Sequence, residues 1–102
     1  PANLLSGLHQ RLYEAYDTFK EASITDRRFK HADVEPLLLA LDTLFQAQSL
    51  GESVEGRPIY EVQIGSGETP VLLWSQMHGD EPTATMALLD IFNFFQIKLK
   101  II

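Results

Sequence analysis

An apolar run that stops abruptly at a cluster of polar residues constrains the fold more than any other feature of the sequence. Residues 71–74 read VLLW, without alternation of polar and apolar side chains, and residues 78–81 read HGDE. A short unbroken apolar run is typical of a strand that is buried on both faces of an α/β sheet. We therefore expect a central strand at residues 71–74.

Apolar residues at helical spacing follow the polar cluster. They recur every three or four positions from Ala84 to Leu99, and Pro82 stands where the first turn of a helix accepts proline. The cluster is thus expected between a central strand and a helix. Open α/β sheets bind their ligands in that crevice, outside the carboxyl ends of the strands.

The preceding residues predict two helices and a hairpin. Residues 3–20 carry apolar side chains at helical spacing, and Asp33 can cap a second helix whose first turn tolerates Pro36. Side chains alternate with period two over residues 45–49 and 60–64, and the turn GESVEG separates the two segments. The expected fold is α/β, a mixed sheet flanked by helices, in the order helix, helix, β-hairpin, central strand, helix.

Composition removes several classes of function. The formal net charge is -6, and no basic stripe offsets it, so we expect no nucleic-acid surface. The chain has no cysteine, so any metal must take nitrogen and oxygen ligands. No apolar run reaches the roughly 20 residues of a membrane span. We expect a soluble protein and favour the cytoplasm, and whether a signal peptide has been removed stays open.

His78 and Glu81 are the candidate metal ligands. Neutral imidazole and carboxylate are ligands of catalytic zinc, which takes three protein ligands and leaves a fourth position for water. An offset of three residues across a strand-to-helix corner lets both side chains turn toward one point. On spacing alone a structural alternative stays open, in which His78 is hydrogen-bonded at a strand end and Glu81 is favoured by the helix dipole.

A longer stretch of sequence resembles the zinc carboxypeptidases, the metallopeptidase family of carboxypeptidase A type. GESVEGRPIYEVQIGSG at residues 51–67 matches the opening of a strand in that family, and VLLWSQMHGDEPTAT at residues 71–85 contains its His-x-x-Glu metal pair. The HGDE form is similar to bacterial members. Asp80 departs from the branch that has arginine at this position, so no substrate subsite is carried over from that branch.

The resemblance implies a peptidase that removes C-terminal residues from peptides or proteins with one zinc ion. His78, Glu81 and a second histidine far downstream would hold the ion, a downstream glutamate would act as general base, and further downstream residues would bind the substrate carboxylate. His78 is the last of the three histidines in the sequence, so the second histidine ligand is absent. We expect residues 1–30 to be a helical lead-in and residues 31–102 to be the N-terminal part of the catalytic domain, inactive alone and able to self-associate through an exposed sheet edge.

Two alternatives stay open. A non-catalytic structural or interaction module would keep the scaffold without turnover. A zinc amidohydrolase of the aspartoacylase and succinylglutamate desuccinylase type, or a peptidoglycan-peptide amidase, would share the His-x-x-Glu pair, although the strand opening at residues 55–60 favours the carboxypeptidases. We expect His31 to be a polar residue near a helix start and Arg57 to stabilise a turn. Trp74, Phe92, Phe94 and Phe95 are expected to be core aromatics.

Overall fold

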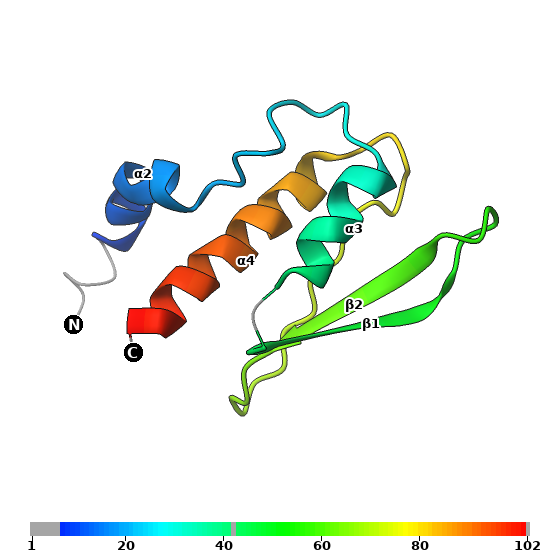
Figure 1. Ribbon diagram of the computed structural model, residues 1–102. Coiled ribbons are helices and arrows are strands. Elements are labelled where there is room, and N and C mark those ends of the chain that lie inside the picture. Colours follow the sequence, from blue (N-terminus) through cyan, green and yellow to red (C-terminus); the bar gives the residue numbers. More distant parts are fainter. Residues whose placement is uncertain (1–6, 42, 102) are drawn as a thin grey trace.

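The computed structural model describes residues 7–41 and 43–101, and three helices and two strands form within them (Figure 1). The α/β class and the order helix, helix, hairpin, helix are confirmed. No helix in this part of the chain is both long and apolar enough to cross a membrane. The elements are α2 (Leu8–Phe19), α3 (His31–Leu39), β1 (Phe45–Glu52), β2 (Pro58–Ile64) and α4 (Thr83–Ile101).

Strands β1 and β2 form the predicted antiparallel hairpin, with Phe45 opposite Ile64 and a bulge between Ser49 and Gly51. The connecting turn is closed by Ser53, whose N–H donates to the carbonyl of Arg57 at 2.8 Å and whose Oγ accepts the Arg57 N–H at 3.1 Å. Arg57 forms an exposed ion pair with Glu55. These contacts agree with the prediction that Arg57 stabilises a turn.

Helix α3 begins at His31, two residues before the predicted cap. The Asp33 carboxylate lies inside the first turn and accepts the Lys30 N–H at 2.8 Å. Asp33 therefore stabilises the start of the helix from its third position, because this carboxylate satisfies a backbone donor just ahead of the first turn. Pro36 consequently lies in the second turn of α3.

Two side-chain contacts hold α3 against β2. His31 Nε2 donates to the carbonyl of Pro58 at 3.0 Å, and the Tyr60 hydroxyl donates to Glu35 at 2.7 Å. The rings of His31 and Tyr60 also stack, with centroids 6.3 Å apart. The hydrogen bond to Glu35 raises the pKa of Tyr60 above its ordinary value. His31 is thus a polar residue at a helix start, as expected.

The apolar core is small and lies between the hairpin and α4. Phe45 is 6% exposed and packs edge-on against Phe92, with ring centroids 5.8 Å apart, and Leu89 is 4% exposed. A folded monomer of this mass exposes about 5,800 Å² of surface. The chain exposes 8354 Å², so it buries unusually little of its own surface.

Helix α2 packs on the opposite side of α4 from the hairpin (Figure 1). The rings of Phe19 and Phe94 pack edge-on with their centroids 5.3 Å apart, and the Tyr16 hydroxyl donates a hydrogen bond to Asp90 at 2.7 Å. No residue of α2 is buried. The helix matches the predicted segment from Leu8 onward, whereas residues 3–6, including Leu5, lie outside the described residues.

The Glu21 carboxylate, just after α2, fastens the lead-in to α4. It accepts hydrogen bonds from the Ser23 N–H, the Ser23 hydroxyl and the Asn93 amide, while the Glu21 N–H donates to Asp90. Burial acts to raise the pKa of Glu21, but the hydrogen bonds from Ser23 and Asn93 outweigh it and lower the pKa below its ordinary value. The charged carboxylate is therefore the form that stabilises this junction.

The predicted central strand at residues 71–74 is wrong. These residues have no regular secondary structure, and their exposed fractions lie between 59% and 77%. An extended segment becomes a sheet strand only when its backbone N–H and C=O groups pair with a neighbouring strand. Among the described residues β1 and β2 pair only with each other, so the sheet is antiparallel rather than mixed. Trp74 and Phe95 are exposed, and the core placement predicted for them is also wrong.

Replacing Phe45 with alanine should lower the free energy of unfolding by about 3 kcal/mol, since it removes the most buried aromatic side chain of the hairpin. Urea unfolding followed by circular dichroism measures the change. Gln46→Ala, at the exposed neighbouring position on the other face of β1, is the matched control and should be nearly neutral. Equal effects of the two substitutions would contradict the placement of the core.

Stability should fall as the pH drops from about 6 toward about 3, because a carboxylate with a lowered pKa stabilises the fold only while it is charged. Part of this loss belongs to Glu21. Its contribution to stability is fully present above the pKa that the Glu21 carboxyl group has in the unfolded chain. The contribution disappears as the pH falls through the lower pKa of the same group in the folded chain. Glu21→Gln should therefore give a flatter profile of unfolding free energy against pH. Glu52→Gln, at an exposed side chain of the hairpin, should follow the unsubstituted chain.

Candidate metal centre

A short turn connects the exposed apolar segment to α4 and carries both candidate ligands. The Glu81 N–H donates to the carbonyl of His78 at 3.1 Å, and the Met86 N–H donates to the carbonyl of Pro82 at 3.1 Å as α4 begins. Pro82 thus stands just before the helix, where its missing N–H costs no hydrogen bond. The turn brings the side chains at positions 78 and 81 to the same side.

Gln76 holds this turn against α4. Its backbone has a φ of 55°, in the left-handed region that non-glycine residues seldom occupy. Its side-chain amide donates to the carbonyl of Gly79 at 3.0 Å, and its amide oxygen accepts from the Thr85 hydroxyl at 2.9 Å. The Thr85 and Ser75 hydroxyl oxygens lie 2.7 Å apart. These bonds offset a backbone strain of about 1 kcal/mol.

The His78 and Glu81 side chains converge, but on a turn rather than at the end of the predicted strand. His78 Nδ1 lies 2.9 Å from Glu81 Oε2, and both side chains are 66% exposed. A carboxylate only accepts hydrogen bonds, so the imidazole donates from Nδ1 in this arrangement. Asp80 is exposed, and within the described residues it contacts neither His78 nor the start of α4.

The pair fits two positions of a zinc ion. Nitrogen and oxygen ligands at about 2.0–2.2 Å from a tetrahedral ion lie roughly 3.4 Å from each other. The observed 2.9 Å separation must therefore widen by about 0.5 Å and the Nδ1 proton must leave, which two exposed side chains allow. Within residues 7–41 and 43–101 no group of three or more His, Cys, Asp or Glu could hold a metal. His9 and His31 thus do not complete the site in one chain.

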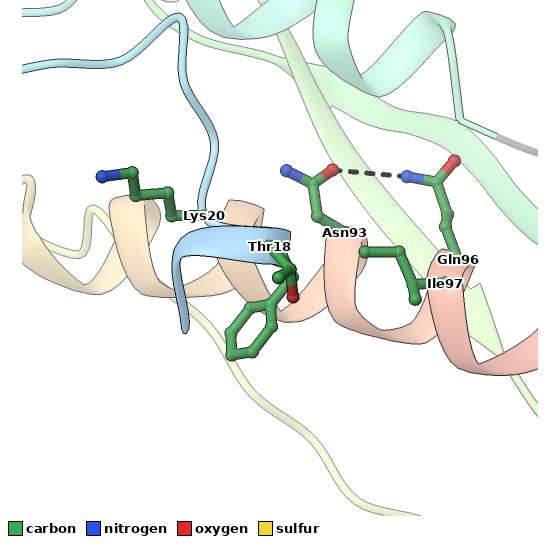
Figure 2. A pocket seen from close by; sticks show the side chains of 6 residues that line it. Thr18, Lys20, Asn93, Gln96 and Ile97 are labelled. Carbon is green, nitrogen blue, oxygen red and sulfur yellow. Dashed lines mark hydrogen bonds between the residues drawn. The ribbon is translucent and has the colours of Figure 1, made fainter. Parts of the chain in front are cut away.

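Two surface hollows lie elsewhere, between α4 and the segment formed by α2 and the residues after it. One, of about 250 Å³, is lined by Thr18, Lys20, Asn93 and their neighbours and contains no carboxylate or imidazole (Figure 2). The other, of about 540 Å³, includes Glu21 and Asp90. Both of those carboxylates already accept the hydrogen bonds that fasten α2, so neither is a free ligand.

Comparison of the chain with protein-family models, with curated proteins and with solved structures finds no match. The carboxypeptidase resemblance therefore rests on residues 51–85 themselves, and the zinc-ligand roles of His78 and Glu81 stay predictions. The sequence reasoning missed Gln76 and Thr85 as supports of the turn. A signal for Thr85 was present, because a hydroxyl residue stands four positions before Leu89 on the apolar face of the predicted helix.

Thr85→Val should lower the unfolding free energy by about 1 kcal/mol, since it keeps the volume but leaves the Gln76 amide oxygen without its donor. Amide hydrogen exchange at Glu81, whose N–H donates to the carbonyl of His78, should become faster, because the turn loses its connection to α4. Thr83→Val, at an exposed position of the same helix, is the matched control. Unchanged exchange in Thr85→Val would show that the hydroxyl does not support the turn.

Proposed function

We propose that this sequence forms the zinc-binding N-terminal part of a zinc-dependent metallocarboxypeptidase, which hydrolyses C-terminal peptide bonds with metal-activated water. The observation that carries the proposal is the approach of His78 Nδ1 to Glu81 Oε2 at 2.9 Å on an exposed turn. Imidazole and carboxylate are the donor set of catalytic zinc in hydrolases. The resemblance of residues 51–85 to the carboxypeptidases suggests the reaction class.

The hairpin supports the carboxypeptidase hypothesis over the amidohydrolase hypothesis. The residues that resemble the family's strand opening form one continuous piece of structure, in which the turn at Ser53, Glu55 and Arg57 leads into β2. Tyr60 of that strand is fixed by its hydrogen bond to Glu35 of α3. The amidohydrolases share the His-x-x-Glu pair, but the resemblance to them does not include this strand opening.

Each residue of the site has a separate task in the proposed reaction. A zinc ion, when bound, would polarise the scissile carbonyl and lower the pKa of a bound water. His78 and Glu81 would hold the ion, and Glu81 would offset one of its two charges. Gln76 and Thr85 would keep the turn in place, as outer contacts do for metal ligands in general. The third ligand, the general base and the groups that bind the substrate carboxylate would come from outside these 102 residues.

The 102-residue chain should bind zinc weakly at low concentration and should not release amino acids from a blocked dipeptide with a free C-terminus. Two ligands leave the ion largely hydrated, and neither a general base nor a carboxylate-binding group is assigned in the chain. Titration with a zinc indicator measures binding, which His78→Ala and Glu81→Gln should abolish and His9→Ala should preserve. Turnover that His78→Ala abolishes would show that the chain already contains a complete site.

The gene provides the direct test of the reaction class. An open reading frame that continues past the codon for Ile102 and encodes a further histidine and glutamate would support a carboxypeptidase. The continued protein should then release C-terminal residues, and this activity should disappear with a chelator, in His78→Ala and in Glu81→Gln. A stop codon directly after Ile102 would instead favour a non-catalytic module.

A further inference from the structure

We propose that zinc joins two copies of this chain, with His78 and Glu81 of both copies forming a single four-ligand site. The proposal rests on the proposed function, because it uses the same two ligands. The shared site forms when no third protein ligand for the zinc ion is available to the chain. The occupant of the exposed surface beside the turn is then a second copy of the chain.

Ligand number supports this arrangement. A zinc ion that is not catalytic is almost always bound by four protein ligands in a tetrahedron. One chain offers two, and no third joins them within the described residues. Two chains related by a two-fold axis through the ion would offer two nitrogens and two oxygens. Both side chains are 66% exposed, so a second copy can reach them.

The segment that precedes the ligands in the sequence is apolar and uncovered. Residues 71–74 have exposed fractions between 59% and 77%, and Met77 is 66% exposed. No charged residue lies between Val71 and Met77. A run of exposed apolar residues of this kind is unusual on a monomer and is typical of an interaction surface. A two-fold axis at the turn would bring this segment of each chain close to that of its partner.

The exposed area is sufficient for a dimer. The chain exposes 8354 Å², against about 5,800 Å² for a folded monomer of its mass. A stable interface of standard size buries only about 800 Å² on each partner. One dimer contact could therefore cover the apolar segment and still leave part of the excess surface exposed.

Charge makes the association depend on the metal. Asp80 and Glu81 place two carboxylates on each turn, and each chain has a formal net charge of -6. Two such turns repel one another when they approach without a cation. A divalent ion between them offsets the charges of the two Glu81 carboxylates. We therefore expect dimers with zinc and monomers without it.

The test combines sedimentation velocity with zinc titration of the 102-residue chain. The mass should double from 11.5 kDa when half a zinc ion per chain has been added, and the zinc concentration at half-saturation should fall as the chain concentration rises. A zinc-bound monomer would overturn the dimer and leave the proposed function standing. An absence of zinc binding would overturn both. A dimer that forms without zinc, or zinc-dependent particles larger than a dimer, would overturn the shared site.

Variants separate the ligands from the apolar contact. His78→Ala and Glu81→Gln should stay monomeric with zinc, whereas His9→Ala, an exposed histidine of α2, should dimerise normally. Trp74→Ser should raise the chain concentration needed for half-dimerisation by about tenfold or more, since exposed aromatic side chains dominate contacts of this kind. Circular dichroism would confirm that each variant is folded. An unchanged dimer in Trp74→Ser would overturn the role of the apolar segment.

Discussion

The packing of Phe45 against Phe92 joins the hairpin to α4, and the rest of the structure is arranged around that helix. On the other side of α4 the contact of Phe19 with Phe94 and the hydrogen bonds of Glu21 and Asp90 hold α2. At its first turn, Thr85 fixes the turn that carries the candidate ligands. Because so few residues are buried, each of these contacts carries a large share of a stability that is only several kcal/mol in small domains.

Local patterns in the sequence predict the elements whose hydrogen bonds are local. The helical spacing from Ala84 onward predicts α4, and the alternation around GESVEG predicts the hairpin, since both elements form their bonds within one continuous segment. The strand predicted at residues 71–74 needs a partner from elsewhere in the chain, and no partner lies beside it among the described residues. Apolar composition identifies a segment that tends to be buried, but it does not provide the surface that buries it.

The candidate site was predictable in part. The spacing of His78 and Glu81 predicts their convergence, because three residues across a turn before a helix bring two side chains to one side. The left-handed backbone of Gln76 was not predictable, because glutamine has no preference for that conformation. The hydrogen bonds of Gln76 to Gly79 and Thr85 depend on how the turn meets α4, which is a tertiary property. The sequence thus indicates the ligands more clearly than it indicates what holds them.

Nitrogen NMR of the histidine side chains tests directly whether His78 binds zinc. Long-range proton–nitrogen correlations distinguish Nδ1 from Nε2 in all three histidines of the chain. Zinc should shift the Nδ1 resonance of His78 and leave His9 and His31 unchanged, and Glu81→Gln should abolish the shift. A His78 resonance that does not respond to zinc, or a response confined to His31, would contradict zinc binding by His78.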